Sequence, residues 1–188
     1  AAVGTLDFYF IDVEQGSAML MVAPSGESLL FDAGSKGNGG RDASRVLAVA
    51  KAAGVKRIDQ LVVSHYHNDH YGAVPELARQ IPIGRFIDHG DNAESGRTSE
   101  WHKYWQIGAG EALWNAYREV RSKARHTVVK PGDPIPMSGI DITVLAAAGK
   151  QISSPLPGAG SRNPSCEITP LRSEDETEDG QSIGILVT

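Results

Sequence analysis

The sequence is poor in several features, and each shortage excludes a class of protein. It has one cysteine in 188 residues, Cys166, so no disulfide can form within the chain and a disulfide-stapled fold is excluded. No apolar run approaches the roughly 20 residues that a membrane-spanning helix needs. Basic residues number 18 against 23 acidic ones, a net charge of −5. This balance does not favour a nucleic-acid partner, although cations bound at one site would still permit a polyanionic substrate.

The composition is that of one globular domain. The chain is 40% hydrophobic and long enough to bury a sizeable core. It begins Ala1-Ala2 without a methionine, which fits either removal of a leader peptide or a trimmed sequence. The compartment stays open, with a periplasmic or secreted location favoured over a cytoplasmic one. We expect Cys166 to be an unpaired thiol or half of a disulfide with a segment outside this sequence.

Hydrophobic periodicity and turn residues predict an α/β fold that starts with a β-meander. Its strands are expected at 4–13, 18–22 and 28–31. The later elements are expected as helix 43–54, strand 61–63, helix 74–81, strand 83–88, helix 111–124, strands 126–129 and 140–145, and a last strand 181–188. A meander followed by alternating helices and strands gives a sheet with helices on one side, the first layer pair of a four-layer αββα sandwich.

The most informative stretch is His65-Tyr66-His67-Asn68-Asp69-His70, directly after the apolar strand 61–63. Packing does not explain three imidazoles and a carboxylate in six residues, because each brings a polar atom that needs a partner. A period of two puts His65 and His67 on one side, where they can share a metal. Asp69 and His70 follow as the pattern turns helical and can reach a second ion. These ligands suit one or two zinc ions (Zn2+), with manganese or iron as alternatives.

The motif His65-x-His67-x-Asp69-His70 resembles the signature of the metallo-β-lactamase fold superfamily of metallohydrolases. Segments 8–16 and 29–34 are similar to the first two strands of that fold. Within the superfamily, the turn Asp-Val-x-Gln-Gly and the segment Gly-Gly-Arg-Asp-Ala-Ser are most similar to the extracytoplasmic domain of competence-type DNA-uptake proteins and their free-standing bacterial relatives. The likeness covers nearly the whole chain and is specific for fold more than for substrate.

The resemblance implies a metal-dependent hydrolase that uses a metal-activated water on an ester, lactone, amide or phosphodiester bond. Its metal ligands would be His65, His67, Asp69 and His70, and Asp69 would also orient the water. The substrate would be a small molecule or a phosphodiester. Redox chemistry on two irons is not expected, because the related oxidoreductases carry a glutamate at the position of His67.

Two further residues are candidates for the site. Asp32 ends the strand 28–31 beside a glycine, where it could cap a turn or hold a ligand histidine from behind; the resemblance favours the second role. His89 follows the strand 83–88, which delivers it to the same sheet edge as the metal loop if the strands are parallel. His89 could be a ligand, but the resemblance favours a place at the rim or in contact with substrate.

Other segments depart from the family pattern or stay ambiguous. The superfamily usually has a third metal histidine soon after a strand like 140–145, but Ala146-Ala147-Ala148-Gly149 stands there and puts a three-histidine site in doubt. The aromatic segment 101–105 is either a lid or part of the packing, and His102 is not expected to be a ligand. The stretches 153–164 and 173–180 are expected to be surface loops or partly disordered.

In the resembled family the last strand leads into a hairpin, an aspartate that bridges two metals and a final histidine, none of which this sequence contains. The resemblance therefore implies that residues 1–188 are a single metallo-β-lactamase-like domain cut before its C-terminal half. A C-terminal half or a second chain is the expected partner, and apolar sheet surface would be exposed without it. The alternative is a non-catalytic metal-binding or interaction domain, or an inactive fragment.

Overall fold

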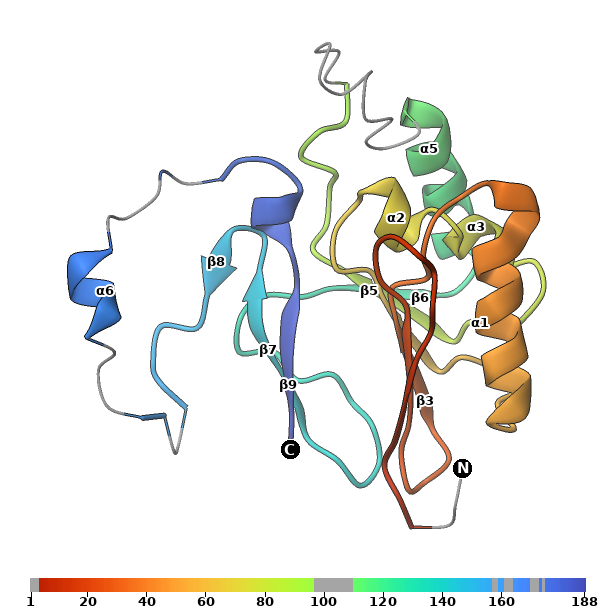
Figure 1. The fold of residues 1–188 in the computed structure, drawn as a ribbon, viewed down its shortest axis with the longest axis horizontal. Coiled ribbons are helices and arrows are strands. Elements are labelled where there is room, and N and C mark those ends of the chain that lie inside the picture. The colour runs from red at the N-terminus through yellow and green to blue at the C-terminus, as the bar shows by residue number, and fades with distance from the viewer. Residues whose placement is uncertain (1–3, 97–109, 157–158, 161–163, 170–172, 174) are drawn as a thin grey trace.

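Two β-sheets and a layer of helices make up the protein (Figure 1). A computed structural model describes residues 4–96, 110–156, 159–160, 164–169, 173 and 175–188. The larger sheet has the strand order β1-β2-β3-β4-β5-β6, and the smaller one has the order β8-β7-β9. The strands are β1 (Asp7–Phe10), β2 (Met19–Val22), β3 (Ser28–Phe31), β4 (Gln60–Val62), β5 (Arg85–Asp88), β6 (Arg125–Val128), β7 (Ile142–Ala147), β8 (Lys150–Gln151) and β9 (Gly184–Val187).

Four helices lie on one face of the larger sheet: α1 (Arg41–Ala52), α2 (Asn68–Tyr71), α3 (Val74–Leu77) and α5 (Gly110–Arg121). The smaller sheet lies on the other face, and the short helix α6 (Ser165–Ile168) is on that side as well (Figure 1). Two 3-10 turns are η1 (Asn38–Gly40) and η2 (Asp179–Gln181). This helix-sheet-sheet order confirms the predicted α/β fold with the layering of an αββα sandwich. No helix among the described residues is long and apolar enough to cross a membrane.

The strand pairings place the loops of interest at one edge of the larger sheet. Strands β1, β2 and β3 form the predicted antiparallel meander, and β3, β4, β5 and β6 run parallel. Parallel strands end at the same edge, so the residues that follow β3, β4 and β5 come together there. These residues are Asp32, the histidine loop 65–70 and His89.

The apolar run Leu61-Val62-Val63 is buried on both faces of the larger sheet. Leu61 and Val63 pack into the core under the helices, while Val62 packs into the core between the two sheets. A strand covered on both faces needs a continuous rather than an alternating apolar run. Each such side chain stabilises the fold by about 1.5 to 3 kcal/mol when fully buried.

A polar cluster around Asp88 ties α5 to the larger sheet. The Asp88 carboxylate, buried at the end of β5, accepts hydrogen bonds from the hydroxyl of Tyr117, the guanidinium of Arg121 and Nε2 of His126. Arg121 also lies over the rings of Trp114 and Tyr117, at 5.3 Å from each centroid. One cation of this helix, Arg121, is therefore used inside the fold.

Several predicted boundaries differ from the structure. The helix expected over 74–81 is regular only as α3, since the chain continues from Leu77 to Ile81 in turns. Strand β8 and helix α6 were not predicted; each is very short, with little periodicity to detect. The aromatic segment 101–105, including His102, lies outside the described residues.

Candidate metal centre

The histidine loop leaves β4 in an extended conformation and then turns into α2. His67 precedes α2 with φ −86° and ψ 145°, which keeps the loop extended as far as this residue. The rings of His65 and His67 are therefore on one side, with centroids 4.7 Å apart. His70 comes from α2, and its ring centroid is 4.0 Å from that of His65. The structure thus brings together all three histidines of the predicted motif.

Backbone contacts from the meander hold this loop in place. The Ser17 N–H donates to the carbonyl of Asp69 at 3.2 Å, and the Ala33 N–H donates to the carbonyl of His70 at 2.8 Å. Gly16 has φ +81°, and a Cβ there would lie only 1.8 Å from the Asp69 carbonyl oxygen. Only glycine permits so close an approach of the turn to the metal loop.

His65, His67 and Asp179 form the one group among the described residues whose ligand atoms converge as a metal site requires. Those atoms all lie within 4.8 Å of one another. Asp179 Oδ1 is 3.4 Å from His65 Nε2 and 3.3 Å from His67 Nδ1. Ligand atoms around a tetrahedral zinc ion, at about 2.0 to 2.1 Å from it, are separated by roughly 3.3 Å. The observed separations fit such an ion.

The surroundings of His65 leave one ring nitrogen available to a metal. Burial, followed by the charges of His70, His67 and His89, lowers the pKa of His65 to about 3, so the ring is neutral at pH 7. The Ser64 hydroxyl donates to Asp32 Oδ2 at 2.7 Å, so it accepts from His65 Nδ1–H at 3.1 Å. The lone pair is then on Nε2, a buried atom without a hydrogen-bond partner among the described residues. An orphaned imidazole nitrogen facing a second imidazole and a carboxylate fits a divalent metal.

His70 and Asp69, which the sequence predicts to reach a second ion, lie close to each other. His70 Nδ1 donates to Asp32 Oδ2 at 2.8 Å, so Nε2 is the ring nitrogen left for a metal. Burial alone would lower the pKa of His70, but Asp32, Asp69 and Asp179 raise it above 6.5. His70 Nε2 lies 3.8 Å from Asp69 Oδ2. Asp32 makes the contact with a histidine that the sequence suggested; its role toward a metal stays a prediction, as do the ligand roles of Asp69 and His70.

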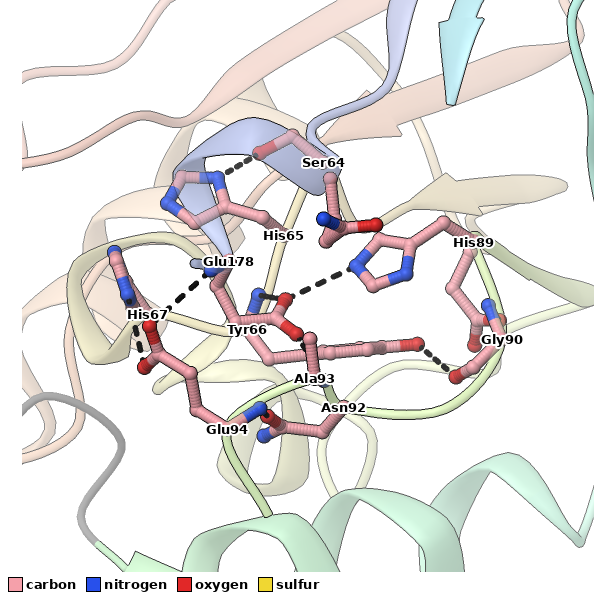
Figure 2. A network of polar contacts seen from close by, with 12 residues as sticks. Ser64, His65, Tyr66, His67, His89, Gly90, Asn92, Ala93, Glu94 and Glu178 are labelled. Carbon is pink, nitrogen blue, oxygen red and sulfur yellow. Dashed lines mark hydrogen bonds and ion pairs between the residues drawn. The ribbon is translucent and has the colours of Figure 1, made fainter. Parts of the chain in front are cut away.

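A buried network of carboxylates lies beside the first site (Figure 2). Glu178 contacts the backbone of Tyr66 and Ala93 and the ring of His89. The carboxylate of Glu94 lies 3.3 Å from His67 Nε2 and also accepts the N–H of Glu178. The network therefore links the histidine loop, the loop after β5 and the segment before β9.

The side chain of His89, expected at the rim of the site or in contact with substrate, is buried in the structure. Its side chain is 2% exposed, and its Nε2 is 3.0 Å from Glu178 Oε2. The expectation placed His89 correctly at the sheet edge, since β4 and β5 are parallel. It did not anticipate the buried carboxylate of Glu178 beside the ring, and a role for His89 toward substrate stays a prediction.

Three acidic residues of this site were not predicted: Glu94, Glu178 and Asp179. The segment 173–180 was expected to be a surface loop because its acidic run is typical of solvated chain, and this was wrong for Glu178, which is fully buried. Asp179 lies near the segment 146–149, where the family pattern has its third histidine. The Ala148 N–H donates to the carbonyl of Gln181, so η2 lies beside the 146–149 segment and brings in a carboxylate. The only sequence signal was a Glu-Asp pair shortly before an apolar strand.

Comparisons with known proteins identify relatives of this chain. The sequence pattern of the Metallo-beta-lactamase superfamily matches residues 11–154. Recombination protein 2 of Haemophilus influenzae is 32% identical over 104 residues, which cover 51% of this chain and 13% of that protein. Hydroxyacylglutathione hydrolase of Aliivibrio salmonicida is 46% identical over 41 residues, which cover 22% of this chain and 16% of that protein.

A solved structure shows the same fold. MEM-A1, a subclass B3 metallo-beta-lactamase isolated from a soil metagenome library, superposes with a TM-score of 0.54 at 20% identity, covering 80% of this chain and 53% of that one. The chain thus spans about half the length of this enzyme and a smaller share of the two sequence relatives. With the matched pattern over most of its length, this chain belongs to the metallo-beta-lactamase superfamily.

Proposed function

We propose that this chain carries the metal-binding part of a metal-dependent hydrolase. One observation carries the proposal: His65 Nε2, His67 Nδ1 and the Asp179 carboxylate face one another at the spacing of metal ligands, and His65 Nε2 is buried without a hydrogen-bond partner. Membership of a superfamily whose members include hydrolases supports it. Zinc is the proposed metal, as one or two ions, with manganese or iron as alternatives.

Each residue of the site has a distinct proposed role. His65, His67 and Asp179 hold a first ion, and Asp69 with His70 contribute to a second. A divalent metal bound there would lower the pKa of a water molecule toward 7 and polarise the oxygen of the scissile group. Asp69, whose side chain is 42% exposed, accepts a hydrogen bond from the attacking water and orients it. Asp32 holds His70 directly and His65 through Ser64.

The proposed reaction is hydrolysis of an ester, lactone, amide or phosphodiester bond. The short match to Hydroxyacylglutathione hydrolase supports hydrolytic chemistry, and the match to Recombination protein 2 supports the kinship with competence-type proteins that the sequence suggested. A small molecule or a phosphodiester is the proposed substrate.

We also propose that residues 1–188 form one domain that a further segment or a second chain completes. Phe8 and Phe10 project from edge strand β1 and are exposed, Phe10 by 82%. Exposed neighbouring aromatic side chains on a sheet edge are typical of a surface that another element covers. Chain 1–188 alone should then bind an apolar fluorescent dye, and Phe8→Ser with Phe10→Ser should abolish most of that signal. An equal signal from the double variant would count against the proposal.

The test of the hydrolase proposal is metal analysis followed by a substrate panel. The protein, saturated with zinc and passed through a desalting column, should retain at least one equivalent of metal. It should hydrolyse a member of a panel of bis-nitrophenyl phosphate, lactones and β-lactams, and Asp69→Asn should lower kcat by about 100-fold. Less than one equivalent of retained metal would sink the proposal. Full metal content without turnover on any member would favour a non-catalytic metal-binding domain instead.

A further inference from the structure

We propose that Glu94 and Glu178 form a carboxylate bridge that positions His67 and Asp179 for metal binding. The two residues are not ligands themselves; each acts through a ligand-bearing segment. This inference rests on the metal site proposed above and adds two positioning residues to it. The network is drawn in Figure 2.

Glu178 is the fixed point of the bridge. Its side chain is fully buried, and a buried carboxylate is stable only when hydrogen-bond donors surround it. Oε2 accepts from the Tyr66 N–H at 2.9 Å and from His89 Nε2–H at 3.0 Å, while Oε1 accepts from the Ala93 N–H at 2.5 Å. Because Asp179 is the next residue, the contacts of Glu178 also fix the position of the Asp179 backbone.

The chain after Asp179 is anchored as well. The Gln181 N–H donates to the carbonyl of Glu178 at 3.0 Å, and the Ile183 N–H donates to the carbonyl of Ser64 at 2.9 Å. A Cβ on Gly180 would lie 2.0 Å from the Asp175 carbonyl oxygen, so the turn is too tight for any other residue. Asp179 is therefore held from both sides, although its own side chain is mostly exposed.

Glu94 connects this anchor to the second ligand. Its Oε1 accepts from the Glu178 N–H at 3.2 Å, and its Oε2 lies 3.3 Å from His67 Nε2. With the hydrogen on Nε2, the lone pair of His67 is on Nδ1, the atom that faces Asp179. A carboxylate on the far nitrogen of a metal-ligating histidine fixes the tautomer and the ring orientation. One oxygen of Glu94 thus contacts the segment that carries Asp179, and the other contacts the ring of His67.

The decisive variant is Glu94→Gln, which keeps the size of the side chain but leaves only one oxygen acceptor. The single oxygen of the glutamine side chain can accept from the Glu178 N–H or from His67 Nε2–H, but not from both. The amide NH2 group then faces the other donor, and that hydrogen bond is lost. We expect zinc affinity, measured by competition with a chromogenic chelator, to fall by about 10- to 100-fold. The matched control is Glu111→Gln, because Glu111 accepts from Ser95 Oγ in the same region and touches neither ligand. The control should bind zinc as tightly as the unsubstituted protein.

A second measurement reads the tautomer directly and does not depend on metal. Nitrogen-15 chemical shifts of the metal-free protein should place the His67 hydrogen on Nε2. Glu94→Gln should move a measurable fraction of it to Nδ1, and Glu178→Gln should broaden or shift the resonances of both His67 and Asp179.

The outcomes separate this inference from the proposed function. Unchanged zinc affinity in Glu94→Gln, or a His67 hydrogen already on Nδ1 in the unsubstituted protein, overturns the bridge. If the unsubstituted protein binds no zinc, the proposed function fails, and the tautomer measurement alone then decides whether Glu94 orients His67.

Discussion

Two polar clusters lie at the same edge of the larger sheet, and they are built in opposite ways. At the end of β5, one carboxylate, Asp88, is surrounded by donors: the Tyr117 hydroxyl, the Arg121 guanidinium, His126 Nε2–H and the Gly90 N–H. Every one of these contacts joins a donor to an acceptor. The cluster is complete as it stands, and its role is to hold α5 and β6 on β5.

At the end of β4, the candidate metal centre with the proposed His67 tautomer has acceptors facing acceptors. His65 Nε2, His67 Nδ1 and Asp179 Oδ1 converge, and in this proposal the hydrogens on the other ring nitrogens donate to Ser64 and Glu94. An arrangement of lone pairs without a donor between them is unfavourable unless a cation is bound. In this account, the direction of the hydrogen bonds, more than the residue types, distinguishes the proposed metal site from the structural cluster.

The largest difference between the two clusters is expected when one histidine is removed from each and zinc affinity is measured. His67→Ala removes a ligand and should lower zinc affinity by more than about 100-fold. His126→Ala, in the Asp88 cluster, should leave zinc affinity unchanged while lowering the melting temperature. Metal content after desalting and calorimetric melting measure the two quantities. Equal loss of zinc in both variants would erase the distinction between the clusters.

An intermediate effect is expected from Asp88→Asn, which breaks the complete cluster. Leaving Arg121 without its buried partner should lower the free energy of unfolding by about 3 kcal/mol at pH 7, with zinc affinity retained. Burial by itself raises the pKa of Asp88, but the bonds from His126, Tyr117 and Arg121 outweigh it and hold the pKa below 3.8. The contribution of this carboxylate is therefore full above pH 3.8 and is lost as the pH falls through the lower folded-state value.

Denaturant unfolding at a series of pH values checks this sign. The stability difference between the unsubstituted protein and Asp88→Asn should narrow as the pH drops below 3.8. A difference that stays constant or widens in acid would mean that the cluster is not held by an ionised Asp88.

The smallest effect is expected from Ser64→Ala, which removes the acceptor of His65 Nδ1–H. The His65 ring would lose the contact that keeps its lone pair on Nε2, and zinc affinity should fall by about tenfold. Ser28→Ala is the matched control, since Ser28 is an equally buried serine whose hydroxyl contacts Arg57 and Asp59, far from the histidines in the sheet. A tenfold loss in both serine variants, or in neither, would contradict the role given to Ser64.

Much of the fold follows from local patterns in the sequence. Hydrophobic periodicity and turn residues predict the meander and the buried strand before the histidines. They also predict the parallel strands that bring Asp32, the histidine loop and His89 to one edge of the sheet. The side on which His65 and His67 project follows from the period of an extended chain. These features depend on near neighbours, so sequence patterns carry them.

The acidic half of the site could not be predicted in the same way. Tyr66 and Glu178, which share a hydrogen bond, are 112 residues apart in the chain. Nothing local distinguishes Glu178, fully buried, from the exposed acids near it, Asp175, Glu176 and Asp179. His89 was placed at the correct edge, but its inward orientation depends on that same distant carboxylate. Long-range partners decide which member of an acidic run is buried.

The most direct test of the metal centre is anomalous diffraction at the zinc edge from crystals of the zinc-loaded protein. We expect a peak about 2.0 to 2.2 Å from His65 Nε2, His67 Nδ1 and an oxygen of Asp179, with no peak at the Asp88 cluster. A peak bound to other side chains, or no peak at saturating zinc, would contradict the assignment of this loop as a metal centre.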